Sequence, residues 1–228
     1  IYHADCLDIL KNLNQHDIDL VFTSPPYNMG PRENNSRPGT KARDYSYRSY
    51  ADDMNEADYD AWMDDVLRCC WSALSDEGAI FWNHKPRSKG KRVTLPFSGN
   101  PPPEIPLRQI IIWDRGSGFQ RNLTHFVPCH EWIMLFAKES FRITTRDVWD
   151  VWRVPSNPDE HHPASFPLKL PTIGIGSTDA QTVLDPFMGS GTTLRAAKDL
   201  GRKAIGIEID ESYCEIAARR MGQEVLDL

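Results

Sequence analysis

The sequence of 228 residues lacks any apolar run near the roughly 20 residues that span a bilayer. Its first residues show no basic segment followed by an apolar one, so no signal peptide is expected. The five cysteines are scattered without the paired spacing of a zinc site, which is typical of reduced thiols in a cytoplasmic protein. The net charge of -6 argues against nucleic acid as a partner unless basic residues gather locally.

Short β-rich runs alternate with helical patterns along the chain. The runs expected to form strands are 18–24, 79–84, 107–113, 131–138, 181–187 and 203–209. Helices are expected over 57–74, ended by Asp76-Glu77-Gly78, over 192–201, closed by Gly201, and over 211–221. Strands that alternate with helices predict a three-layer α/β fold around a mostly parallel sheet.

Three stretches interrupt this alternation, and each is expected to be a long loop. They are 28–50, rich in Asn, Arg, Pro and Tyr, then 86–106, with PRSKGKR and NPPPEIP, and finally 153–179, with several prolines and glycines. Long loops inside a compact domain are often functional.

A glycine-rich turn lies in VLDPFMGSGTTLRAAKDLG, residues 183–201. A strand is expected to end at Asp185, and a helix to begin near Thr192, with Gly189 and Gly191 between them. Glycines let the backbone approach a ligand, and a helix N-terminus offers unpaired amide groups. Glu208, about 20 residues beyond the turn, can accept both ribose hydroxyls of a nucleoside cofactor.

Two other nucleotide motifs fit this turn less well. A phosphate-binding P-loop requires Lys before the Thr pair, and GSGTT has none. A nicotinamide fingerprint requires a third glycine, where this chain has Leu194. A nucleoside cofactor is therefore favoured, with a tight turn that binds nothing as the alternative.

The stretch DLVFTSPPYNMG, residues 19–30, ends a buried strand with two prolines. Proline has no backbone N–H, so Pro25 and Pro26 cannot continue a sheet ladder. The Ser24 hydroxyl and the Pro25 carbonyl then form a rigid pair of acceptors, and Tyr27 adds a flat face. Such a pair suits an NH₂ group on a planar ring, whose lone pair it directs at an electrophile. The alternative is a strand terminator with a packing tyrosine.

TSPPY, LDPFMGSGTT and GIEID resemble motifs of the amino-methylating DNA methyltransferases, in the permuted, β-class order. The likeness spans nearly the whole chain. It implies a single catalytic domain over 1–228, with a Rossmann-like sheet that is mostly parallel and includes an antiparallel hairpin strand. It also implies S-adenosyl-L-methionine as the cofactor and the amine of a DNA base as the methyl acceptor. Because transfer from a sulfonium needs no metal, none is expected.

The resemblance assigns roles residue by residue. Ser24, Pro25, Pro26 and Tyr27 match the catalytic tetrapeptide. HADCLDIL places Asp5 and Cys6 at the cofactor's adenine, and HPASFPLKL, which enters a helix, places Ser165 at its carboxylate. The full set implied to bind the cofactor is Asp5, Cys6, Ser165, Asp185, Pro186, Phe187, Gly189, Ser190, Gly191, Thr192 and Glu208.

The implied partner is double-stranded DNA, from which the base is flipped and stacked on Tyr27. The segments at about 28–50 and 86–106 are the candidates for contacting DNA. Their basic residues form two local sets that can neutralise phosphates, although charge runs are often only solvated faces. The residues expected to contact DNA are Arg32, Arg37, Lys41, Arg43, Lys85, Arg87, Lys89, Lys91 and Arg92.

Ser24 favours cytosine N4 as the methylated atom, because Ser usually accompanies cytosine in this family and Asp usually accompanies adenine. Adenine N6 is the alternative, since Asn28 after Tyr27 also occurs among adenine enzymes. RNA or protein-amide methylation and a non-catalytic DNA-binding protein are further alternatives. A cognate restriction endonuclease and a homodimer are compatible with this interpretation.

One geometric requirement follows from these assignments. The Ser24–Tyr27 corner and the glycine turn are far apart in the chain. They must nevertheless lie side by side at one edge of the sheet if a methyl group is to pass between them.

Overall fold

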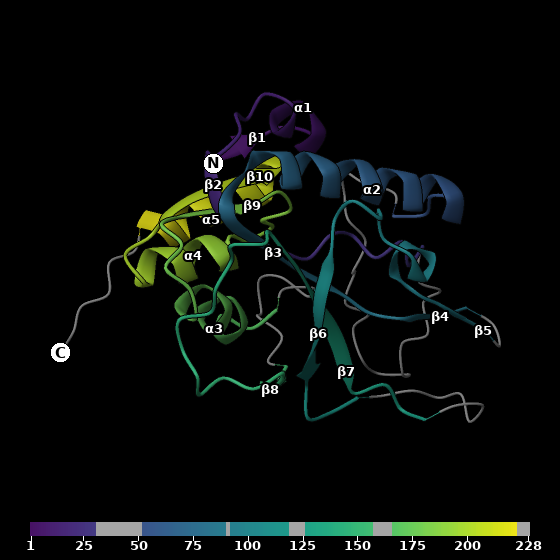
Figure 1. The fold of residues 1–228 in the computed structure, drawn as a ribbon. Helices are drawn as coiled ribbons and strands as arrows, with labels where there is room; N and C mark the ends of the chain where they lie inside the picture. The colour runs from purple at the N-terminus through teal and green to yellow at the C-terminus, as the bar shows by residue number, and fades with distance from the viewer. Residues whose placement is uncertain (31–51, 90–91, 119–125, 157–165, 223–228) are drawn as a thin grey trace, which may run out of the picture.

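The computed structural model describes residues 1–30, 52–89, 92–118, 126–156 and 166–222. In these residues one sheet has eight strands, in the order β1-β10-β9-β2-β3-β7-β6-β8 (Figure 1). Their bounds are Tyr2–His3 for β1, Ile18–Thr23 for β2, Leu74–His84 for β3, Leu107–Asp114 for β6, His130–Ala137 for β7, Val151–Arg153 for β8, Thr182–Asp185 for β9 and Lys203–Glu208 for β10.

The sheet is mostly parallel, as the sequence predicts. β1, β10, β9, β2 and β3 pair in parallel, and β6 pairs in parallel with β8. β7 runs antiparallel to both of its neighbours, β3 and β6. The mixed α/β fold with an antiparallel hairpin strand is therefore confirmed.

The helices cover both faces of the sheet and make three layers. Their bounds are Cys6–Leu10 for α1, Glu56–Ala73 for α2, Lys169–Gly176 for α3, Thr192–Asp199 for α4 and Glu211–Gly222 for α5. α1 and α2 lie on one face, and α3 and α4 pack together on the other (Figure 1). In the part of the chain described, no helix is both long enough and apolar enough to cross a membrane.

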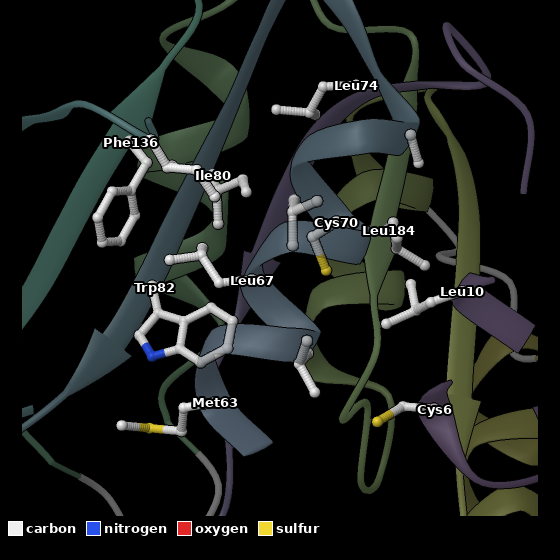
Figure 2. Packing of buried hydrophobic residues seen from close by; sticks show 14 of the residues in the cluster. Cys6, Leu10, Met63, Leu67, Cys70, Leu74, Ile80, Trp82, Phe136 and Leu184 are labelled. Carbon is white, nitrogen blue, oxygen red and sulfur yellow. The ribbon is translucent and has the colours of Figure 1, made fainter. Parts of the chain in front are cut away.

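Alternation along the central strands creates both cores. In β2, Val21 belongs to the core beneath α2, whereas Leu20 and Phe22 belong to the core beneath α3 and α4. Figure 2 shows the first core, where Leu67 of α2 faces Trp82 of β3. A strand that is apolar on both faces reads as a continuous hydrophobic run, which is why β2 could be predicted.

Two boundary expectations were wrong. Asp76-Glu77-Gly78 does not end α2, which ends at Ala73 and passes directly into β3. Leu74 is already extended and pairs with Ile18, and the register then shifts, leaving Asp76 and Glu77 exposed in an irregular part of the strand. The stretch 86–106 is not all loop either, because β4 (Arg87–Lys89) and β5 (Arg92–Thr94) pair as a separate sheet and a 3₁₀ helix follows over Pro96–Gly99.

The corner and the glycine turn share one edge of the sheet, as required. β2 and β9 are parallel neighbours, so their C-terminal ends lie together. There the Thr23 hydroxyl donates to the Asp185 carboxyl group across 2.7 Å. Both residues are buried, so the hydrogen bond is shielded from water.

Burial also changes the acidity of this joint. It raises the pKa of Asp185 from 3.8 to about 6, against the opposing effect of hydrogen bonds from Thr193, Thr23 and the Phe187 amide. The folded protein therefore binds this proton more tightly than the unfolded chain does.

We predict that replacing Gly174 by Ala destabilises the protein. A Cβ on Gly174 of α3 would lie 2.7 Å from a ring carbon of Phe22, which is fully buried. The expected loss is about 1–3 kcal/mol in the free energy of unfolding, measured with a chemical denaturant. Gly176→Ala in the same helix is the control, because its new methyl group meets nothing closer than 3.9 Å. Equal stability of the two variants would contradict the close packing of α3 on β2.

We predict that Asp185 makes unfolding depend on pH. Its contribution favours the folded state below pH 4 and is lost as the pH rises through about 6, because only the folded state holds the proton in that interval. The expected decline is on the order of 2–3 kcal/mol between pH 4 and pH 7. It is read as the difference between the wild type and Asp185→Asn in denaturant titrations. Parallel curves for the two proteins would show that Asp185 does not titrate in this way.

Candidate active site

The Ser24–Tyr27 corner is held by its own hydroxyl groups. The Ser24 hydroxyl donates to the Tyr27 hydroxyl across 2.9 Å, and Tyr27 donates to Glu131 across 3.0 Å. Glu131 lies at the start of β7, which its antiparallel direction brings to the same edge as the end of β2. The corner is therefore fixed by a strand that follows it by about a hundred residues.

Glu131 is buried, with 6% of its surface exposed, and it is surrounded by donors. Asn83 donates its side-chain amide to one carboxylate oxygen across 2.9 Å, and Arg115 approaches the other at 3.3 Å. Burial, together with the Glu131 charge, raises the pKa of Tyr27 well above 10. The Tyr27 hydroxyl therefore keeps its proton at neutral pH.

A second chain of contacts fixes the diproline backbone. The Pro26 carbonyl accepts a hydrogen bond from the Tyr59 hydroxyl at 2.5 Å, and Tyr59 also meets Nε2 of His84 at 2.8 Å. Burial lowers the pKa of His84 to about 3, so its ring is neutral. Pro26 therefore has its carbonyl direction set from α2 and β3 as well as by its own ring.

The half-buried ring of Tyr27 lies among groups from β3 and the segment after it. Its centroid is 4.5 Å from that of His84, at an interplanar angle of 33°. The Lys85 ammonium lies 5.3 Å from the centroid. The flat face expected from the sequence thus already contacts an imidazole and a cation.

The residues after the corner are held against the start of α2. The amides of Asn28 and Met29 both donate to the Asp52 carboxylate, at 2.7 and 3.1 Å, and the Gly30 amide donates to the Asp52 carbonyl at 2.7 Å. Asn28 has a φ of 52°, a left-handed conformation that these bonds stabilise.

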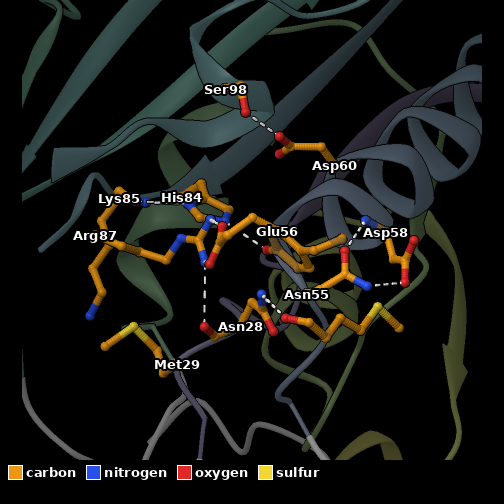
Figure 3. A network of polar contacts seen from close by, with 12 residues as sticks. Asn28, Met29, Asn55, Glu56, Asp58, Asp60, His84, Lys85, Arg87 and Ser98 are labelled. Carbon is orange, nitrogen blue, oxygen red and sulfur yellow. Dashed lines mark hydrogen bonds and ion pairs between the residues drawn. The ribbon is translucent and has the colours of Figure 1, made fainter. Parts of the chain in front are cut away.

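Arg87 reinforces this arrangement and does not belong to an exposed basic surface. It is 5% exposed, donates to both oxygens of Glu56 and reaches the Asn28 carbonyl at 3.3 Å (Figure 3). A buried guanidinium needs such a paired partner. The structure therefore places Arg87 inside the protein, in contrast to the DNA-facing position expected from the sequence.

The glycine turn bends between β9 and α4 at two left-handed residues. Gly189 and Gly191 have φ values of 50° and 81°. The Gly189 amide donates to Glu208 at 3.0 Å, and the other Glu208 oxygen accepts from the Asp210 amide at 2.9 Å. Burial raises the pKa of Glu208. Glu208, at the end of β10, is thus brought to the turn as expected.

Asp5 and Cys6 lie beside Glu208, because β1 pairs with β10 and the Ala4 amide donates to the Glu208 carbonyl at 3.0 Å. Asp5 is exposed and caps α1 by accepting from the Leu7 amide at 2.8 Å. Cys6 is buried, and burial raises its pKa to about 12, so it remains a thiol.

An aromatic group borders the turn. The half-buried ring of Phe187 lies 5.4 Å from Trp62 of α2 and 6.5 Å from Trp82 of β3, centroid to centroid. Pro186, Ser190 and Thr192 are buried. These side chains offer an apolar surface next to the polar group of Glu208, a combination that suits a nucleoside.

Several predicted residues cannot be placed. Ser165, Arg32, Arg37, Lys41, Arg43 and Lys91 lie outside the described residues. Lys89 lies in β4 opposite Arg92 of β5, and the Arg92 side chain is exposed.

Sequence reasoning missed Glu131, Asn83, Tyr59 and Asp52. One signal was available for Glu131, because a single acid at the start of an otherwise apolar strand is unusual. Its place at the edge depends on the antiparallel direction of β7, which local sequence does not specify. Tyr59 and Asp52 belong to the beginning of α2 and the residues before it, and only the packing of that helix brings them to the corner.

Curated relatives match nearly all of the chain. The type II methyltransferase M.ScaI of Streptomyces caespitosus is 26% identical over 269 residues, which cover 100% of this chain and 83% of M.ScaI. The type II methyltransferase M.BglII of Bacillus subtilis is 28% identical, over 98% of this chain and 69% of its own length. The DNA adenine methyltransferase YhdJ of Escherichia coli (strain K12) is 25% identical, over 97% of this chain and 82% of YhdJ.

Solved structures share the fold. PvuII DNA methyltransferase, described as cytosine-N4-specific, superimposes with a TM-score of 0.73 at 18% identity, over 99% of this chain and 87% of that one. A DNA modification methylase of Thermus thermophilus, TTHA0409, complexed with S-adenosyl-L-methionine, gives a TM-score of 0.69 at 21% identity, over 97% and 92% of the two chains.

A family model described as a DNA methylase, N6_N4_Mtase, matches residues 18–148 and 141–219. The matched residues include the Ser24–Tyr27 corner, the glycine turn and Glu208. With the strand order and the shared edge, this match shows that the chain belongs to the N6/N4 DNA methylase family.

Proposed function

We propose that this chain, as one catalytic domain, transfers a methyl group from S-adenosyl-L-methionine to the exocyclic amine of a base flipped out of double-stranded DNA. Cytosine N4 is the favoured acceptor. The observation that carries the proposal is the hydrogen bond between Thr23 and Asp185, because it joins the catalytic corner directly to the glycine turn. Two sites that are separate in the chain thereby become neighbours.

The residues at the turn fit the cofactor. Gly189 and Gly191 leave the backbone open to close approach, and Glu208 retains lone pairs beyond those used by two amides. Phe187 supplies an apolar face, and Asp5 lies on the adjoining strand end. When bound, S-adenosyl-L-methionine supplies a methyl group activated by the positive charge of its sulfonium.

The corner's role is to orient the amine. In this proposal the Ser24 hydroxyl oxygen and the Pro25 carbonyl accept the two amine hydrogens, which directs the nitrogen lone pair at the methyl group. The half-buried Tyr27 ring borders the flipped base. Lys85, Lys89, Lys91 and Arg92, with the basic residues of 28–50, are proposed to neutralise phosphates.

Adenine N6 is the second candidate. Relatives of both specificities match this chain, since YhdJ is described as an adenine enzyme and the PvuII enzyme as a cytosine-N4 enzyme. The presence of Ser24, a neutral hydroxyl, supports cytosine.

We predict that expression in a bacterial host without DNA methylation leaves N4-methylcytosine in one short sequence motif. Mass spectrometry of hydrolysed DNA identifies the base, and single-molecule sequencing identifies the motif. Ser24→Ala is the control for background and should reduce methylation about 100-fold or more, because one acceptor for the amine is lost. N6-methyladenine alone would establish the second candidate, and absence of both modified bases would refute the DNA activity.

We predict that Gly189→Val abolishes measurable binding of S-adenosyl-L-methionine in calorimetric titration. A β-branched residue is strained at a φ of 50° and narrows the approach to the turn. Gly201→Val is the matched control, because Gly201 also has a positive φ, 69°, and a Cβ there meets nothing within 4 Å. This control should lose stability while keeping the wild-type affinity. Normal affinity in Gly189→Val would remove the turn from the cofactor site.

A further inference from the structure

The hydroxyl groups at the corner form a chain whose direction is set at one end. The carboxylate of Glu131 can only accept hydrogen bonds, so the Tyr27 hydroxyl must donate to it across their 3.0 Å contact. The oxygen of Tyr27 is then an acceptor toward Ser24, whose only hydroxyl hydrogen is used in that bond of 2.9 Å. The Ser24 oxygen is left with lone pairs and no hydrogen to offer.

Asn83 supports this direction independently. It is 1% exposed, and its amide nitrogen faces both the Glu131 carboxylate, at 2.9 Å, and the Tyr27 hydroxyl oxygen. The reversed amide would point an oxygen at a carboxylate, which has no hydrogen to give. The Asn83 oxygen itself has no hydrogen-bond partner among the described residues, a cost that the two donated bonds offset.

The charge at the end of the chain is supported from its other side. Arg115 lies 3.3 Å from the Glu131 oxygen that does not face Tyr27, and it also donates to the Pro128 carbonyl at 2.8 Å. A buried carboxylate remains charged when it has such a partner and several donors. Tyr27 keeps its proton because burial and Glu131 raise its pKa well above 10.

We propose that Glu131 is a positioning residue that acts through Tyr27 to make the Ser24 oxygen an acceptor only, aimed at the amine of the base. This inference rests on the proposed function, because it assumes that Ser24 captures the amine. Hydrogen bonds in a chain polarise one another, so a carboxylate two bonds away increases the negative charge on the Ser24 oxygen. A neutral serine thereby gains part of the accepting strength of a carboxylate.

The chemical class of the substrate follows from this direction. A group that brings hydrogens to Ser24, such as an exocyclic NH₂, is accepted, whereas a carbonyl oxygen in the same place meets only lone pairs and is repelled. Cytosine and adenine each present such an amine, whereas thymine presents a carbonyl at the corresponding ring position. The chain from Glu131 to Ser24 therefore selects amino bases over keto bases.

The test uses the intact protein with three variants: Glu131→Gln, Tyr27→Phe and the double variant. Methyl transfer from labelled S-adenosyl-L-methionine is measured on genomic DNA of the methylation-free host. Each single variant is expected to lower kcat tenfold or more while KM for the cofactor stays unchanged. Because both act through one chain, the double variant should be no slower than the slower single variant.

A second readout does not depend on turnover. In protein labelled with ¹³C at the tyrosine Cζ, the Tyr27 signal is identified by its absence from Tyr27→Phe. Glu131→Gln should shift that signal and lower the pKa of Tyr27, because the repelling carboxylate is gone. Glu215→Gln, an exposed change on α5, is the matched control and should leave both the signal and kcat unchanged. Glu131→Asp keeps the charge and should recover part of the lost kcat.

Three results would overturn the inference: an unchanged kcat in Glu131→Gln, effects that multiply in the double variant, or a Tyr27 signal that does not move. A parallel loss of thermal stability and cofactor affinity would likewise show that Glu131 only holds the fold. If the wild type itself neither binds the cofactor nor methylates DNA, the proposed function fails instead, and the Tyr27 signal still decides whether the chain exists.

Discussion

The hydrogen bond between Thr23 and Asp185 is the interaction on which the site depends. β2 ends one residue before Ser24, and β9 ends where the glycine turn begins, so this bond fixes the two halves of the site relative to one another. Burial makes it strong and also sensitive to geometry, since a carboxyl group with a lost partner has no water to replace it. The parallel pairing of β2 with β9 brings the groups together, and the side chains then hold them in place.

Acceptors gather at this edge of the sheet. Glu131 and Glu208 lie on either side of the β2–β9 pair, and both are held by donors from the protein. Such a concentration of oxygen atoms suits a cationic cofactor and an amine substrate, both of which bring positive charge or hydrogens to the site. The acidic net charge of the chain is compatible with its proposed action on DNA, because the acids that bind at this edge are held inside the protein.

Much of this arrangement could be predicted from the sequence. The apolar run of β2, the glycine turn and Glu208 are local patterns, and parallel strands place their C-terminal ends together. The rest depends on packing. Charge alone suggested a surface role for Arg87, yet Glu56 and the Asn28 carbonyl draw it inside. Glu131 went unnoticed because its importance comes from the direction of β7, and the transition at Leu74 because a helix can pass into a strand without a turn.

The bonds of Asp52 have a consequence for how such a protein can diversify. Gly30 and Asp52 are joined by a backbone hydrogen bond, so the two ends of the sequence between them are held next to each other. Lengthening a segment whose ends are already fixed adds little entropy cost, about 0.6 kcal/mol for each doubling. Residues 31–51 can therefore be exchanged or extended during evolution while the chemistry beside them is inherited intact.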